Sequence, residues 1–517
     1  MDITIATLLI LCFLASIATL LLFVWSLSQR SAVWGGEGAN VIFHQPGVSD
    51  KTPEKDNHPQ LEDLDQSSKS AVTLLLASAV FWLMLGSLFG VIASIKLHMP
   101  EFLADSALLT FGRIRPAHLN IVMYGWSSLA GLGVATWMIP RLLGTPLRGA
   151  QWITAATWLW NCALGMGSGA LLFGYTEGKE FLELHWSVDM LFVVAGFMMA
   201  VPLIKTLLEK QVEHLYVSLW YISAALVWFP VLFLLANIPG LFQGTSEAVM
   251  NWWFGHNVLG LWITPLALAT AYYLIPKILG VAINSYRLSL IGFWGLALFY
   301  AQVGVHHLIG SPVAYWVQIV SIVSSVMMLV PVIAFATNMQ GTLKGQWKRC
   351  WHSNSLRFVV FGVVCYMLSS VQGTLEALPA MNKVVHFTQY TVGHAHFGMY
   401  AFFSFIMFGA IYFIGPRIAC VEWPHPQWIR LHFWLASGGI VLYVVALSIG
   451  GVLQGYAMND VDQPFMASVL LLEPWLVLRS IAGWSLTVGH GLMAINLYQL
   501  VFSAPRETAP TPLPIGS

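Results

Sequence analysis

Apolar runs close to 20 residues long recur along almost the whole of this 517-residue chain. Each is long enough for a helix to cross a bilayer whose hydrocarbon core is about 30 Å thick. The composition agrees, since 57% of the residues are hydrophobic and only 9% are charged. Because backbone polar groups in lipid must be paired within the protein, such runs fold as helices. The sequence therefore predicts an all-α polytopic membrane bundle with thirteen helices, at residues 4–26, 70–95, 116–140, 151–173, 187–208, 214–237, 254–276, 288–309, 314–337, 358–378, 392–415, 430–450 and 480–502.

Polar stretches divide the chain into four parts. The first apolar run has no basic residue before it, so residues 1–30 are predicted to be a transmembrane anchor rather than a cleaved signal peptide. Residues 31–69 are predicted to be a polar linker, residues 70–505 the helical core, and residues 506–517 a disordered tail.

Lysine and arginine placement predicts the orientation. Of the 23 such residues, 17 fall in the tail and in the loops that follow odd-numbered helices, and six fall on the opposite side. Basic residues are enriched on the cytoplasmic side, so the N-terminus is expected outside and the C-terminus inside. The expected location is the bacterial inner membrane, with many passes.

Six histidines fall at one depth of these helices, although they come from four separate segments. With the orientation above, all six lie in the outer third of the membrane. Ionisable residues within a bilayer are candidates for function by default. The layer consists of His118, His256, His306, His307, His394 and His396.

Spacing indicates how these imidazoles divide among metals. Residues two apart on a helix point about 200° apart, so His394 and His396 can each ligate a haem on opposite flanks. His118 can complete the axial pair of one haem, which suits electron transfer, while the other haem keeps an open position. His306 and His307 are adjacent at a helix end, and with His256 they give three imidazoles, a set that suits copper.

Five segments carry a family resemblance: FGRIRPAHLNIVMYGW, GYTEGKEFLELHW, NWWFGHNVLGLW, SYRLSLIGFWGLALFYAQVGVHH and TVGHAHFG. They resemble the catalytic subunit of the C-family haem–copper oxidases, the cbb(3)-type cytochrome c oxidases, over about residues 70 to 505. The resemblance implies two haems b and one copper ion. The implied ligands are His118 and His396 for the low-spin haem, His394 for the high-spin haem, and His256, His306 and His307 for copper.

The resemblance also implies a catalytic tyrosine. In this family a tyrosine six residues before the HH pair is linked covalently to the first copper histidine, and that position is Tyr300. Tyr300 lies seven residues before His307, two turns away on the same face of an α-helix. A phenol there can supply an electron and a proton to O₂ reduction.

Further positions are implied less directly. Thr264, Tyr272 and Ser289 resemble the family's single proton pathway, in which Gly292 replaces a common histidine. By periodicity alone these hydroxyls would be ordinary packing residues. At the haem edge, Arg113 and Arg115 are placed to pair with haem carboxylates, and Glu180 is predicted to help bind calcium. A glutamate of the family near the high-spin haem falls on Gln372, with Glu376 one turn away.

Two other functions compete with an oxidase. A nitric oxide reductase of the same superfamily carries iron in place of copper and a glutamate near the metal histidines. Position 260, one turn beyond His256, is a glycine, which together with Tyr300 favours the oxidase. A non-catalytic membrane haem protein would need only axial ligands and leaves the HH pair unexplained.

The chain has no C-x-x-C-H motif for haem c attachment, so it must receive electrons through partners. The expected partners are subunits that carry haem c and a c-type cytochrome donor, with no nucleic acid. The N-terminal segment FVWSLSQRSAVWGGEGANVIF is loosely similar to the one-helix assembly protein of the same oxidases.

Overall fold

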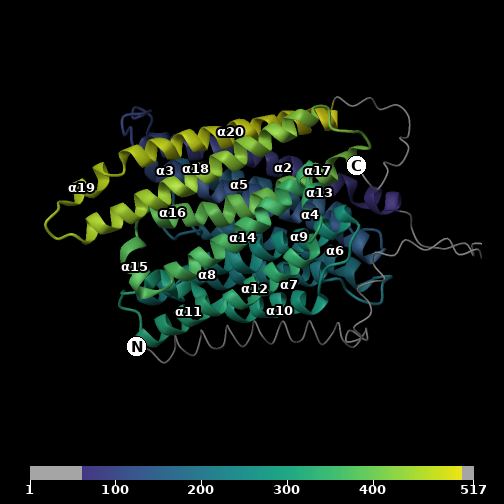
Figure 1. Ribbon diagram of the computed structural model, residues 1–517, viewed down its shortest axis with the longest axis horizontal. Coiled ribbons are helices and arrows are strands. Elements are labelled where there is room, and N and C mark those ends of the chain that lie inside the picture. The colour runs from purple at the N-terminus through teal and green to yellow at the C-terminus, as the bar shows by residue number, and fades with distance from the viewer. Residues whose placement is uncertain (1–60, 503–517) are drawn as a thin grey trace, which may run out of the picture.

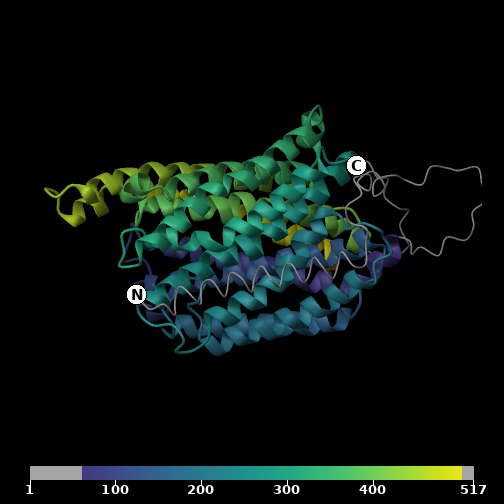
Figure 2. The same cartoon turned by 90° about the horizontal axis from the view of Figure 1, so that it is seen from below.

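The computed structural model describes residues 61–502, and it is helical in every predicted membrane region of that range. Figures 1 and 2 show the long helices running side by side as one bundle. Ten helical spans of the described part are long and apolar enough to cross a membrane, and some of these spans consist of two or three consecutive segments. The long α-helices are α2 (Leu61–Lys96), α3 (Phe111–Asn120), α4 (Ser128–Leu143), α5 (Ala150–Leu172), α6 (Trp186–Leu208), α7 (Val217–Ala236), α8 (Thr245–Asn257), α9 (Thr264–Leu279), α10 (Tyr286–Phe299), α11 (Tyr315–Met327), α12 (Leu329–Leu343), α14 (Leu356–Glu376), α16 (Gln389–His396), α17 (Phe405–Ala419), α18 (Pro426–Asn459) and α20 (Glu473–Phe502).

Short elements cap or connect these helices. They are η2 (Ala107–Leu109), α13 (Trp347–His352), α15 (Pro379–Val385) and α19 (Phe465–Leu470). The described residues contain no β-strand, only an isolated bridge between Lys179 and Leu182. The predicted all-α membrane bundle is thus confirmed over residues 61–502, whereas the predicted anchor at 1–30 and the tail at 506–517 lie outside the described residues.

Two regions are more helical than predicted. Residues 61–69, assigned to the polar linker, form the first turns of α2. Arg141 donates two hydrogen bonds, of 2.6 and 2.5 Å, to the Asp65 carboxylate in this stretch. This long-range pair stabilises a polar helical turn that the composition alone did not predict. The ends of α18 and α20, joined through α19, extend past the rest of the bundle (Figure 1).

Four irregular helical segments interrupt the long rods next to the predicted ligands. Three are π-helices, a form that is rare in proteins but, where it occurs, is often found at functional sites. They are η3 (Ile121–Ser127), η4 (Val258–Ile263) and η6 (Phe397–Ser404), which follow His118, His256 and His396 within three residues. The fourth, η5 (Tyr300–Leu308), is a 3₁₀-helix that contains both His306 and His307.

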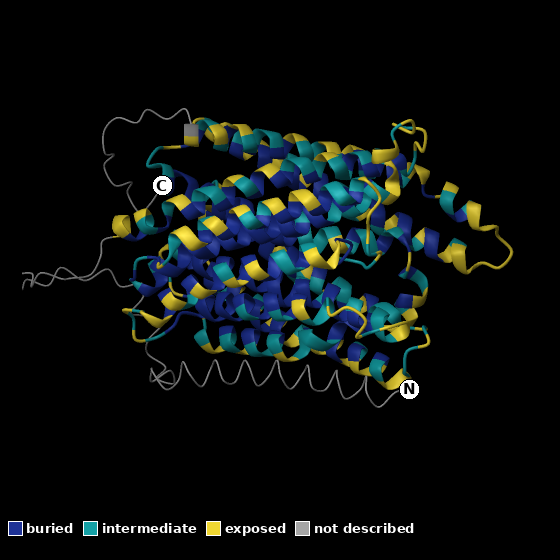
Figure 3. Ribbon diagram, turned by 180° about the vertical axis from the view of Figure 1, so that it is seen from behind, coloured by how far each residue is buried: buried dark blue, intermediate teal, exposed yellow. Residues whose placement is uncertain are grey.

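Large aromatic side chains fill the centre of the bundle. Trp160 stacks on Phe229 with ring centroids 5.2 Å apart, and Phe229 in turn contacts Trp262 at 4.5 Å. Figure 3 shows buried residues gathered inside the bundle and exposed residues on its outward faces. This packing holds α5, α7 and η4 together and so fixes the helix that carries His256.

Candidate metal centre

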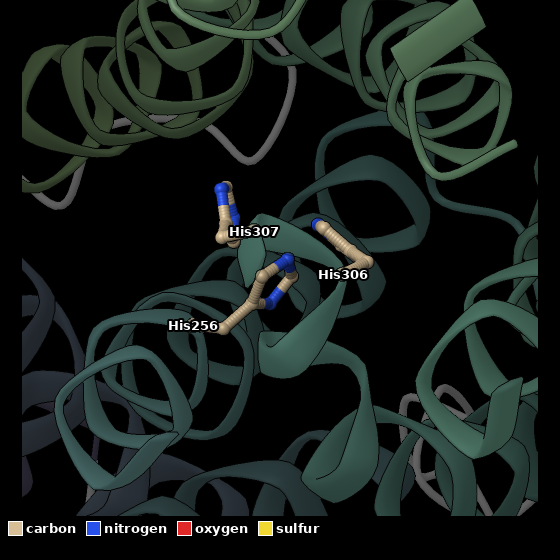
Figure 4. Close-up of side chains that lie close together, drawn as sticks. All are labelled: His256, His306 and His307. Atoms are coloured by element: carbon tan, nitrogen blue, oxygen red, sulfur yellow. The ribbon is translucent and has the colours of Figure 1, made fainter. Parts of the chain in front are cut away.

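His256, His306 and His307 converge on one point. One ring nitrogen from each lies within 4.8 Å of the others, and in the part of the chain that the structure describes this is the one cluster of three or more metal-ligating side chains. Figure 4 shows the three rings grouped at the end of α8 and along η5. The His256 Nδ1 is buried without a hydrogen-bond partner. Three converging imidazoles fit a copper ion.

A serine fixes which nitrogen of His306 is free. The Ser325 hydroxyl donates to the Ser321 carbonyl at 2.8 Å, so its oxygen accepts from His306 Nδ1, also at 2.8 Å. The His306 proton is therefore on Nδ1, and the lone pair of Nε2 is left for a metal. His307 is held differently, by stacking on Trp252 with centroids 4.1 Å apart.

The 3₁₀ geometry of η5 changes one step of the sequence reasoning. With three residues per turn, Tyr300 and His307 are not two whole turns apart, so the α-helical face does not bring them together. Tyr300 instead contacts His256, with ring centroids 5.0 Å apart. Gly304 allows the backbone of η5 to pack against Trp252, because a Cβ at this position would lie 2.3 Å from the Trp252 carbonyl oxygen.

Gly260 leaves the space that the Tyr300 ring occupies. A Cβ at position 260 would lie only 1.7 Å from Cε1 of Tyr300. Real side chains do not approach so closely, so a side chain at position 260 and the Tyr300 ring in this position exclude each other.

His118 and His396 face each other as a parallel pair. Their ring planes are 10° from parallel, with centroids 6.4 Å apart. His118 Nδ1 donates to the Gly86 carbonyl at 2.7 Å, and His396 Nδ1 donates to the Val392 carbonyl at 2.9 Å. Carbonyls only accept, so both rings carry their proton on Nδ1 and keep Nε2 as the ligating atom. This pair fits the two axial positions of one haem.

Sequence reasoning missed two polar neighbours of this pair. The Tyr443 hydroxyl lies 3.3 Å from His396 Nε2, and Arg479 donates to that hydroxyl at 3.0 Å. The signal available in the sequence is an arginine near the start of an apolar segment, which the orientation argument treats only as a loop charge.

His394 points away from His396, as their spacing predicts. Its Nδ1 lies 3.4 Å from Gln372 Oε1 and 3.7 Å from Glu376 Oε1, both on α14. A Cβ at Gly373 would lie 2.8 Å from the His394 ring, so α14 passes close to this histidine. Because Nδ1 faces these two oxygens, Nε2 is the ring nitrogen through which His394 would ligate a second haem.

Comparison with known proteins agrees with this geometry. Residues 70–485 match the family model described as cytochrome c and quinol oxidase polypeptide I. The chain is 31% identical to the cbb3-type cytochrome c oxidase subunit CcoN1 of Stutzerimonas stutzeri, over 83% of this chain and 94% of that protein. It is 26% identical to a nitric oxide reductase polypeptide of the same organism, over 67% and 75%. A solved heme-copper terminal oxidase dimer has the same fold, with a TM-score of 0.71 at 16% identity over 86% and 85% of the two chains.

The chain belongs to the haem–copper oxidase subunit I family. Membership implies haem and copper cofactors and a place in a multi-subunit complex, and the histidine triad is consistent with the copper site.

In this subunit I, the predicted edge residues pair with one another. Arg115 binds both oxygens of Glu180, at 3.0 and 2.5 Å, and lies 3.5 Å from Glu183. Arg113 is turned toward the Leu172 carbonyl at 3.2 Å. Burial raises the pKa of Glu183 to about 7, with a further rise from Glu180 and opposing effects from Arg115 and Asn120. A calcium ion at Glu180 would have to compete with Arg115.

The predicted proton-path residues of subunit I are all buried. Thr264 is 8% exposed, and Tyr272 and Ser289 are fully buried. The Ser289 hydroxyl donates to the Tyr286 carbonyl at 2.6 Å, whereas the Tyr272 hydroxyl faces the Asn338 side chain. No direct hydrogen bond joins the three within residues 61–502, so a path along them requires water.

Proposed function

We propose that this subunit is the catalytic subunit of a cbb3-type terminal respiratory oxidase. It reduces O₂ to water with electrons from a c-type cytochrome, and the reaction is coupled to proton translocation. The position of the Tyr300 ring next to Gly260 is the main support for the proposal. A Cβ at position 260 would lie 1.7 Å from this ring, so position 260 cannot be a glutamate while Tyr300 lies beside His256.

The ligands divide between two haems and one copper ion. His118 and His396 hold the low-spin haem, His394 holds the high-spin haem, and His256, His306 and His307 hold copper. When bound, the high-spin haem and copper supply the metals to which O₂ binds and most of the electrons for its cleavage. Tyr300 supplies a proton and a further electron from beside the copper ligand His256.

The order of these residues on α16 would hold the two haems close together. Because one residue separates His394 from His396, this helix would place the low-spin haem beside the high-spin haem, which suits electron transfer between them. Arg115 and Arg479 lie toward the low-spin ligands and can balance carboxylates of the haem edge. Partner subunits with haem c would deliver the electrons, because no haem c motif is present in this chain.

In this proposal, protons are taken up from the side of the membrane opposite to the one near which the metal-binding histidines lie. The distribution of basic residues supports a cytoplasmic location for that side and a periplasmic N-terminus. Thr264, Tyr272 and Ser289 form the proton path toward Tyr300, with water between the hydroxyls. Calcium at Glu180 is a further expectation, and it would require Arg115 to give up one of its present contacts.

The composition of the purified complex tests the proposal. It should contain two haems b and one copper ion per chain and should consume O₂ with reduced cytochrome c. Non-haem iron in place of copper, with nitric oxide reduction and no O₂ consumption, would support the reductase instead. His306→Ala should abolish O₂ reduction and leave the low-spin haem spectrum intact. Haem bands without copper or turnover in the wild type would indicate a non-catalytic haem protein.

A further inference from the structure

Three polar atoms surround the space left by Gly292 on α10. A Cβ added at this buried glycine would lie 3.3 Å from the Tyr221 hydroxyl, 3.7 Å from the Tyr272 hydroxyl and 3.8 Å from the Pro331 carbonyl oxygen. These atoms come from α7, α9 and α12, so four helices meet at this point.

One phenol hydroxyl at this space lacks a partner. Tyr221 and Tyr272 are fully buried; the Tyr221 hydroxyl has no hydrogen bond within the described residues, and the Tyr272 hydroxyl faces only the Asn338 side chain. Their rings stack with centroids 6.0 Å apart, and Phe293 packs edge-on against Tyr221 at 5.1 Å. A buried hydroxyl without a partner costs about 1–3 kcal/mol, so the Tyr221 hydroxyl indicates a missing partner.

A water molecule beside Gly292 would have all three atoms as partners. A buried water needs two to four polar partners, and the two hydroxyls and the carbonyl provide three. The carbonyl has a second lone pair that an intrahelical bond leaves free. Ser289 lies three residues before Gly292 on the same face of α10, so the space is also next to the serine of the proton path.

We infer that Tyr221 is a further proton-transfer residue, which acts through a water held at Gly292 between Tyr221 and Tyr272. The inference rests on the proposed oxidase function. Each hydroxyl accepts one proton as it releases its own, so no phenol is left ionised after a proton has passed. Where the family commonly has a histidine, this chain uses a glycine, a water and the Tyr221 hydroxyl.

Proton uptake by the purified, assembled complex tests the role of Tyr221. Tyr221→Phe removes one hydroxyl and keeps the ring packing against Tyr272 and Phe293. We expect flash-induced proton uptake, followed with a pH-sensitive dye, to slow about tenfold or more. Haem content, the reduced haem spectrum and CO binding should equal those of the wild type, since no ligand changes.

Two further variants make the test decisive. Gly292→Ala adds a methyl group 3.3 Å from the Tyr221 hydroxyl, which narrows the space for the proposed water, and should slow proton uptake in the same way with the tyrosine retained. Tyr412→Phe removes a buried phenol that bonds His432 at 2.7 Å, outside the path, and should stay within about twofold of the wild type.

Wild-type proton uptake in Tyr221→Phe, with both haems intact, would overturn the inference. If Tyr221→Phe does not assemble, wild-type uptake in Gly292→Ala would do the same. A wild-type complex that consumes no O₂ would refute the proposed function, which is a separate outcome.

Discussion

The Glu376 carboxylate oxygen Oε1 lies 3.7 Å from Nδ1 of His394 and is buried with no hydrogen-bond partner among the described residues. Gln372 Oε1 approaches the same nitrogen at 3.4 Å. A histidine ligand is oriented and made more basic by the group that accepts its second N–H. Glu376 therefore supplies a carboxylate beside the predicted high-spin haem ligand, one turn from the position where the family has its glutamate.

Neutralising this carboxylate should alter the high-spin haem selectively. In Glu376→Gln an amide that cannot ionise replaces the carboxyl beside His394, so at alkaline pH, where this buried carboxyl is ionised, we expect the midpoint potential of the high-spin haem to rise above that of the wild type. Turnover should fall about tenfold or more, as for other residues that support a metal ligand. Potentiometry of both haems and the iron–histidine Raman band are the measurements.

The double variant Gln372→Glu with Glu376→Gln is the matched control, because it moves the carboxylate by one turn and keeps the charge. It should restore the high-spin potential. Equal potentials in Glu376→Gln and the wild type would show that the carboxylate does not act on His394.

A methyl group at Gly260 should destabilise the copper side of the site. Its Cβ would overlap the Tyr300 ring at 1.7 Å, so the ring or η4 must move. Overpacking of this kind costs about 1–3 kcal/mol, occasionally more. We expect Gly260→Ala to lower the melting temperature of the complex and its O₂ turnover.

Gly169→Ala on α5 is the comparison, since a Cβ there meets nothing within 4 Å. It should match the wild type in melting temperature and turnover. A Gly260→Ala protein as stable and active as Gly169→Ala would mean that Tyr300 does not occupy this space.

The membrane bundle was predictable because apolar runs report burial in lipid directly. The convergence of the histidines followed as well, since topology sets the depth of each residue. The 3₁₀ form of η5 was not predictable, because it depends on Gly304 packing against the Trp252 backbone, a contact between separate segments. The start of α2 depended in the same way on the long-range pair of Asp65 with Arg141.

Ser325 should set copper affinity through His306. Removing its hydroxyl in Ser325→Ala leaves the His306 Nδ1 proton without its 2.8 Å acceptor and frees the ring to rotate. Loss of such a supporting contact typically costs about 10–100-fold in metal affinity. Copper content after dialysis against a graded chelator series is the measurement.

Ser324→Ala provides the control, since its hydroxyl donates to Gln302 Oε1 at 3.0 Å and not to a histidine. Its copper retention should equal that of the wild type. If Ser325→Ala retains copper equally well, the serine does not position His306.

Glu183 should make stability depend on pH between about 4.5 and 7. Burial raises the folded-state pKa of this carboxyl to about 7 from its ordinary value of 4.5. The folded state therefore binds more protons than the unfolded state in this window, and stability falls as the pH rises through it. The full penalty, at most about 3 kcal/mol, is present above pH 7.

Replacing this carboxyl by an amide tests the pH dependence. Glu183→Gln removes the titration and keeps an acceptor for Asn120, so its melting temperature relative to the wild type should be higher at pH 8 than at pH 5. Glu247→Gln changes a more exposed carboxylate that pairs with Lys179 at 3.2 Å, and its difference from the wild type should vary little with pH. The same difference for Glu183→Gln at both pH values would show that the Glu183 carboxyl is already ionised in the folded protein at pH 5.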